Sequence, residues 1–399
     1  FQVRDTEAAH RSLLAMAGAG VTLDLLDRIV AQLARELPSS CDPDRGLRNL
    51  ERFFLASRSP ISFAALMVRD PSSLGSLLEI SASSQFLSDL LIQDPESFDL
   101  VRLTDGQPVA KPTLIEELRA EVMMASSSKT VRSRLRCFRN RELLRIGYGD
   151  IVRKFDVERT SRQLTFLAEA ICEVGLEYCQ RRFETKFGQP LDETGKLAKL
   201  AIIAKGQLGA GNMDYVSPLR LTAIFDSHGR NDGKPKLENA EYFERLLSEF
   251  SDLLSQGSGP GDCYRVEFEK NRPSATRQCQ LMLESIRYFD QQATPLDRMD
   301  AVTTRFLCGD RKTGEAYLAA LRTQVFRNEF SQSDLTEFQS LKRRLLSRSD
   351  TSHSFRHLKS DMGGLDDLEF TIRFLQLLMG TRIPEIQSGN VFDVLFQLE

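Results

Sequence analysis

The sequence lacks the features that mark membrane proteins and nucleic-acid-binding proteins. No apolar run approaches the ~20 residues that a membrane-spanning helix needs, and no signal peptide is visible after Phe1. The net charge is only −3, from 53 Lys and Arg against 56 Asp and Glu. No general excess of positive charge would therefore attract nucleic acid or acidic lipid, and we expect neither a membrane nor a nucleic acid as a partner.

Metal-binding and disulfide patterns are also missing. The seven cysteines are odd in number, contain no C-x-x-C pair, and include Cys172 and Cys179 at a helical spacing of seven residues. His353 and His357 have the spacing of two zinc ligands on a helix, but no Glu follows His353 as H-E-x-x-H requires. We interpret both as ordinary histidines. We expect no metal, and free, mostly buried thiols in a reducing cytoplasm.

Strand patterns are confined to one part of the chain. The apolar runs Leu200–Ala204 and Leu219–Phe225 are too short for ordinary helices, and glycines lie between them. Tyr264–Lys270 alternates apolar and polar residues, which is typical of a strand with one buried face. We predict an α+β fold that is mainly α, with one small mixed β-sheet between residues 198 and 270.

The remainder of the chain has helical periodicity. Residues 156–187 carry apolar side chains every three or four positions and predict one long helix, and residues 240–254 predict another. The segment 188–195 contains two glycines and Pro190, and Thr294 precedes Pro295, so both places are breaks between elements. We predict an N-terminal helical region over 1–190, an α/β domain over 196–290, and a C-terminal helical bundle over 295–399.

A basic run precedes the long helix. One interpretation is an arm that binds phosphate or nucleic acid, and the other is a helix with a solvated basic face. We favour the solvated face, because Glu142 and Asp150 interrupt the run and no aromatic residues alternate with it as base stacking would require. The basic residues are Lys129, Arg132, Arg134, Arg136, Arg139, Arg141 and Arg145.

The glycine-containing stretch resembles a known catalytic motif. The nucleotidyltransferase motif of glutamine synthetase adenylyltransferase reads roughly G-K-L-G, a short linker, then S-D-x-D-L. The matching positions here are Gly206, Leu208, Gly209, Ser217 and Leu221. The resemblance implies a sheet of the nucleotidyltransferase (DNA polymerase β-like) type. It also implies similarity to the N-terminal half of a bifunctional enzyme, the half that removes AMP from glutamine synthetase.

The chain departs from that motif at the residues that carry the chemistry. Gln207 replaces the family's Lys, and Pro218 and Arg220 replace its two Asp. Two Asp at positions i and i+2 point to the same face of a strand and can hold Mg²⁺ against a phosphate. Proline has no carboxylate, and arginine stays protonated and repels a cation. By resemblance Glu267 takes the place of the third metal-binding acid, and we regard it as vestigial.

Other residues keep the positions that contact nucleotide in the family. By resemblance these are Gly206, Gln207, Gly209, Ser217 and Arg272, although the segment before Arg272 is one residue longer than in the family. From alternation along the strands, Arg220 and Glu267 should point to the same face, and we predict that they form an ion pair there.

Two functions remain open. One is a non-catalytic relative, a regulatory or binding module in nitrogen-related signalling whose partner is glutamine synthetase or a nitrogen-signalling protein. The other is an active nucleotidyltransferase that adds or removes AMP and uses Mg²⁺ with ATP or ADP. We favour the first and expect no cofactor. Whether a second catalytic half follows residue 399, and which oligomer forms, is left open.

Overall fold

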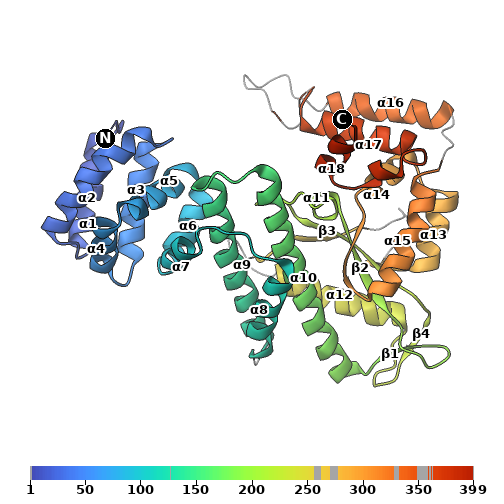
Figure 1. The fold of residues 1–399 in the computed structure, drawn as a ribbon. Helices are drawn as coiled ribbons and strands as arrows, with labels where there is room; N and C mark the ends of the chain where they lie inside the picture. Colours follow the sequence, from blue (N-terminus) through green and yellow to red (C-terminus); the bar gives the residue numbers. More distant parts are fainter. Residues whose placement is uncertain are drawn as a thin grey trace. The chain divides into compact units, whose positions relative to one another are not determined.

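The computed structural model describes residues 2–125, 127–255, 262–269, 277–327, 332–347, 358, 361 and 363–398. The fold is mainly helical with one small mixed sheet, as predicted (Figure 1). By contacts the chain divides into two units. The first contains Phe1–Ala110 and Cys137–Leu164, and the second contains Lys111–Arg136 and Thr165–Glu399. The division into 1–190, 196–290 and 295–399 follows secondary structure, a different criterion, and stays a prediction.

The first unit is built from short helices. Three of them begin with a proline, at Pro43, Pro60 and Pro71. The backbone N–H at the first helical position makes no hydrogen bond within the helix, so a proline, which has no N–H, costs no hydrogen bond there. The Phe53 ring packs edge-on against Phe63 and Phe98, with centroids 5.0 and 6.0 Å away. The helices are α1 (Thr6–Gly18), α2 (Leu23–Glu36), η1 (Leu37–Ser39), α3 (Pro43–Ala56), α4 (Pro60–Arg69), α5 (Pro71–Ser83), α6 (Gln85–Gln93) and α7 (Ser97–Thr104).

The basic run lies on α9 (Ser128–Ile151), which contributes to both units. The interpretation as a solvated face is wrong for Arg145, which is 4% exposed. Its Nε donates to Glu142 at 2.8 Å and its Nη2 donates to Gln163 at 3.0 Å. The side chain is buried because these acceptors satisfy its donors inside the first unit. Lys129 and Arg136 are exposed, as the interpretation expects.

The second unit contains the predicted long helix and the sheet. The predicted helix over 156–187 is confirmed as α10 (Val157–Phe187), whose first turns belong to the first unit. The predicted helix over 240–254 is confirmed as α12 (Asn239–Ser255). The other helices are α8 (Lys111–Met123), α11 (Gly206–Ala210), α13 (Met282–Gln291), α14 (Pro295–Ala301), α15 (Arg311–Val325), α16 (Gln332–Ser347), α17 (Leu365–Met379), η2 (Pro384–Gln387) and α18 (Val391–Leu398).

The sheet has strand order β5-β3-β2-β7, and β6 continues alongside β3 beyond β5. β2 runs antiparallel to β3 and β7, whereas β5 and β6 run parallel to β3. The window 198–270 was too narrow, because β6 and β7 lie outside it; these strands are too short to show a clear alternation. The strands are β2 (Leu200–Lys205), β3 (Leu219–Phe225), β5 (Val266–Phe268), β6 (Cys279–Leu281) and β7 (Arg305–Gly309). A separate pair joins β1 (Pro190–Asp192) to β4 (Gly229–Asn231).

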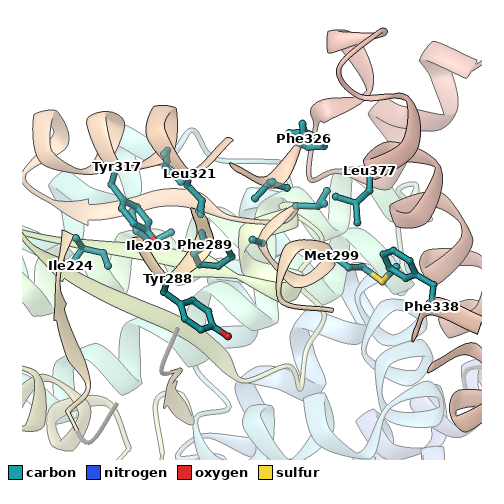
Figure 2. Packing of buried hydrophobic residues seen from close by; sticks show 14 of the residues in the cluster. Ile203, Ile224, Tyr288, Phe289, Met299, Tyr317, Leu321, Phe326, Phe338 and Leu377 are labelled. Atoms are coloured by element: carbon teal, nitrogen blue, oxygen red, sulfur yellow. The ribbon is translucent and has the colours of Figure 1, made fainter. Parts of the chain in front are cut away.

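Alternation along β3 gives the sheet two different faces. Phe225 contacts Phe243 of α12 on one face, with ring centroids 5.7 Å apart. On the other face, Ile203 and Ile224 join a core with Tyr317 and Leu321 of α15 (Figure 2). Arg220 belongs to this second face, at the end of the sheet where the apolar core stops.

None of the helices in the described part of the chain combines the length and the apolar character that a membrane span requires.

Candidate functional site

The glycine motif forms the short helix α11 directly after β2. Gly206 has a φ of +57°, a conformation that side chains disfavour. A Cβ at Gly209 would lie 2.0 Å from the carbonyl oxygen of Thr303, so only glycine fits there. The motif glycines therefore allow α11 to lie against the backbone around Thr303.

Side chains from distant parts of the sequence hold this loop. The Gly206 N–H donates to Thr303 Oγ1 at 3.0 Å. Arg305 donates from Nε to the Gly209 carbonyl at 3.1 Å and from Nη2 to the Leu208 carbonyl at 2.8 Å. Thr303 and Arg305 could not be predicted from the sequence, because both lie about a hundred residues beyond the loop they stabilise.

Gln207, at the position of the family's lysine, interacts with the C-terminal region. Its Nε2 donates to Glu369 of α17 at 3.3 Å, and Glu369 also pairs with Arg373 at 3.1 Å. Glu369 of α17 therefore lies beside the glycine loop in space. A neutral amide here supplies no charge to a phosphate, unlike the lysine that it replaces.

Ser217 and Pro218 precede β3 in a local turn. Asp214 Oδ1 accepts the N–H groups of Val216 and Ser217 at 2.9 and 2.6 Å. This is an Asx-type turn, in which the carboxylate stabilises its own backbone. Asp214 therefore acts locally in the turn.

Four charged side chains fill the space where the resemblance places a metal. Lys205 Nζ lies 2.9 Å from Glu269 Oε2 and 2.6 Å from Asp300 Oδ2. Arg220 donates from Nε to Glu269 Oε1, and its Nη2 lies 3.1 Å from Asp300 Oδ1. Each cation thus contacts both anions. We call this closed arrangement of Lys205, Arg220, Glu269 and Asp300 the charge ring.

The charge ring is largely removed from water. The Lys205 side chain is 8% exposed, those of Glu269 and Asp300 are each 24% exposed, and that of Arg220 is 35% exposed. Burial by itself raises the pKa of Asp300, but Lys205 and Arg220 outweigh burial and hold that pKa below its ordinary value. Burial by itself lowers the pKa of Lys205, but Asp300 and Glu269 raise it above its ordinary value. Lys205 and Asp300 therefore stay charged at neutral pH.

The predicted partner of Arg220 was wrong, although the predicted face was right. Glu267 is the register neighbour of Arg220, yet its Oε1 pairs with Arg265 at 2.8 Å. Arg220 instead pairs with Glu269, two residues along on the same face. Alternation identifies the face that a side chain takes, but not the carboxylate that a long guanidinium reaches.

The charge ring does not fit a divalent metal. Each of the four carboxylate oxygens of Glu269 and Asp300 already contacts a nitrogen of Lys205 or Arg220. A metal ion would also lie next to two positive charges. Within the described ranges, no group of three or more His, Cys, Asp or Glu side chains is placed to hold a metal.

Four of the five predicted nucleotide-contacting residues lie in the described part of the chain. Gly206, Gln207 and Gly209 lie in α11, and Ser217 lies in the turn before β3. Arg272 lies outside the described residues. A nucleotide-binding role for these five residues stays a prediction.

The chain is similar to known proteins along most of its length. A family model described as "Glutamate-ammonia ligase adenylyltransferase" matches residues 74–320. A "Bifunctional glutamine synthetase adenylyltransferase/adenylyl-removing enzyme" of Xanthomonas campestris pv. campestris is 25% identical over 373 residues, 93% of this chain and 36% of the relative. The enzyme of the same name from Pseudomonas aeruginosa is 25% identical over 355 residues, 87% of this chain and 36% of the relative. The chain thus spans little more than a third of the length of these relatives.

Proposed function

Because the chain belongs to the glutamate-ammonia ligase adenylyltransferase family, we propose that it is a non-catalytic member that uses the nucleotidyltransferase scaffold as a regulatory or binding module. The observation that carries this proposal is the charge ring. Adenylyl transfer requires positive charge aimed at the phosphoryl oxygens, which metal ions held by carboxylates supply. Here Lys205 and Arg220 form ion pairs with Glu269 and Asp300 instead.

The charge ring has a structural role in this proposal. It joins the end of β2 through Lys205 to β3 through Arg220, to the segment after β5 through Glu269, and to α14 through Asp300. β2 and β3 both contact α11, so the ring and the contacts of Thr303 and Arg305 together support the glycine loop. In this proposal the scaffold needs no metal, and the two cations of the charge ring are both engaged by carboxylates.

The proposed partner is a protein. The relatives are named for their action on glutamine synthetase, and we propose that this module binds glutamine synthetase or a nitrogen-signalling protein. We place it in the cytoplasm. Cys172, Cys179, Cys279 and Cys308 are buried thiols, which supports a reducing compartment.

A transfer assay tests the loss of activity. The full chain is incubated with adenylylated or unmodified glutamine synthetase, Mg²⁺ or Mn²⁺, and either phosphate or ATP, with the Pseudomonas aeruginosa relative as the active control. We expect no AMP transferred or released above the level without enzyme. Turnover that disappears in Glu269→Gln or Asp300→Asn would overturn the proposal and establish an active enzyme that uses these acids.

A binding assay tests the regulatory role. Immobilised glutamine synthetase, in both modification states, is titrated with the chain by surface plasmon resonance. Saturable binding that persists in Arg220→Met would support a module whose binding does not depend on the charge ring. If neither state binds, glutamine synthetase is not the partner.

A further inference from the structure

A concave site lies at the opposite end of β2 from the charge ring. It is a cavity of about 420 Å³, within the range of pockets that hold small ligands. Its walls come from α10, from the residues that lead into β2, and from the β7–α15 junction, all in the second unit. Lys199 lines it, and Lys199 is six residues before Lys205, which corresponds to ~20 Å along a strand. The cavity and the charge ring are therefore separate sites.

One wall of the cavity is acidic. Glu173, Glu177, Gln180 and Glu184 line it at spacings of four, three and four residues, so they share one face of α10. Arg119 pairs with Glu177 at 2.9 Å and lies 3.8 Å from Glu173. One guanidinium therefore serves two carboxylates, and the wall keeps an excess of negative charge.

Glu184 is the carboxylate on this wall that has no partner. The described residues offer it neither an ion pair nor a hydrogen bond. It lies close enough to Tyr242, which also lines the cavity, to affect the phenol. Burial raises the pKa of Tyr242, and the charge of Glu184 raises it further. The Glu184 carboxylate is thus available to a ligand.

The facing wall carries an ammonium group. Lys199 is half-buried and has no ion pair within 4.0 Å among the described residues. Asp310 is nearby, but its Oδ1 accepts the Thr313 N–H and hydroxyl, both at 2.9 Å. The other cations of the lining are already paired, Lys111 with Glu169 at 2.8 Å and Arg311 with Glu315 at 3.1 Å. Lys199 is therefore the available anion-binding group of this cavity.

We propose that this cavity binds a free basic α-amino acid of the arginine or lysine class. Its α-carboxylate would pair with Lys199, and its cationic side chain would lie along the acidic face of α10 with Glu184 as a partner. The aliphatic part of the ligand would lie against Leu176, Phe243 and Leu246, which belong to the apolar part of the lining. A ligand with one negative and two positive groups matches the unpaired ammonium, the unpaired carboxylate and the excess negative charge of the wall.

Isothermal titration of the full chain with L-arginine, L-lysine, L-glutamine and agmatine tests this proposal. We expect L-arginine or L-lysine to bind more tightly than L-glutamine, which lacks the side-chain charge. Glu184→Gln should weaken this binding at least about tenfold, because it removes a charge-assisted hydrogen bond. Lys199→Met should weaken the binding of L-arginine by a similar factor. It should leave the binding of agmatine unchanged, because agmatine has no carboxylate.

Matched controls keep the test specific. Glu193→Gln and Lys196→Met change the same charges in the turn before β2, outside the cavity lining. Neither should change affinity, and thermal unfolding should show that all four variants remain folded. Absence of binding by both basic amino acids, equal binding of L-glutamine, or equal weakening by the control variants would each overturn the proposal.

Discussion

Replacing Lys205 with methionine tests whether the charge ring stabilises the second unit. Methionine fills a similar volume but removes the ammonium that contacts Glu269 at 2.9 Å and Asp300 at 2.6 Å. Both carboxylates then depend on Arg220 alone, so one negative charge stays uncompensated in a partly buried place. The stranded charge, rather than the lost contact, should dominate the effect.

The expected magnitude follows from burial. Removing one partner of a fully buried ion pair costs about 3–5 kcal/mol, whereas an exposed pair contributes about 0–1 kcal/mol. Lys205 is 8% exposed, close to the buried limit, but Arg220 remains to compensate part of the charge. We therefore expect Lys205→Met to lower the free energy of unfolding by about 2–3 kcal/mol, and Arg220→Met, at 35% exposure, by about 1 kcal/mol.

Urea unfolding followed by circular dichroism measures these changes as shifts of the midpoint at constant slope. Adding Asp300→Asn to Lys205→Met restores charge balance, so the double variant should recover about 1–2 kcal/mol relative to the sum of the single variants. The exposed substitution Lys196→Met is the control and should stay within about 0.5 kcal/mol of the parent. A Lys205→Met loss no larger than the control's, or strict additivity with Asp300→Asn, would refute the reasoning.

The pH dependence of stability tests whether the effect of Lys205→Met is electrostatic. The pKa of Asp300 is lowered in the folded state, so its contribution to stability is present above its unfolded pKa and is lost as the pH falls through its folded pKa. Below that range Asp300 is protonated and no longer needs a cation. The difference in stability between the parent and Lys205→Met should therefore narrow as the pH is lowered from 7 towards 3. A difference that stays constant over this range would assign the effect to packing.

Two further substitutions test other contacts by the same denaturation assay. Gly209→Ala places a Cβ 2.0 Å from the Thr303 carbonyl oxygen, and we expect it to lower the free energy of unfolding by about 2–4 kcal/mol. Gly18→Ala is the control, because a Cβ there has nothing within 4 Å, and it should be nearly neutral. Equal effects of the two substitutions would contradict the close approach at Gly209. Arg145→Met leaves the buried Glu142 without its 2.8 Å partner, and we expect it to lower the free energy of unfolding by about 3 kcal/mol. The exposed substitution Arg136→Met on the same helix is the control and should change it by at most about 0.5 kcal/mol.

The sequence predicted the elements whose periodicity is long or strict. β3 occupies Leu219–Phe225 as expected, and α10 ends at Phe187 as expected, because each has enough residues to display its period. β6 and β7 were missed, since three and five residues cannot establish an alternation. Their strand conformation comes from pairing with β3 and β2, which is a tertiary effect.

Half of the charge ring could be foreseen. The face taken by Arg220 follows from the apolar residues on either side of it in β3, and Glu269 was visible as an acidic residue in the alternation of residues 264–270. Asp300 could not be foreseen, because it lies 80 residues from Arg220 on a short helix whose local pattern marks nothing unusual. Lys205 could not be predicted for a different reason. It is the last residue of an apolar strand, where a lysine is ordinarily expected to be solvated.

The composition of the charge ring explains how its two carboxylates are compensated by cations of the protein. Carboxylates gathered on one face of a sheet repel each other, and in a metal site the ion supplies the compensating charge. Here an ammonium and a guanidinium supply it, two positive charges against two negative ones, with every carboxylate oxygen in contact with a nitrogen. A divalent ion could enter only by displacing both cations into a partly buried environment where they would lack partners. The ring is therefore stable in its own right, and this is why we place the binding functions of the module on other surfaces.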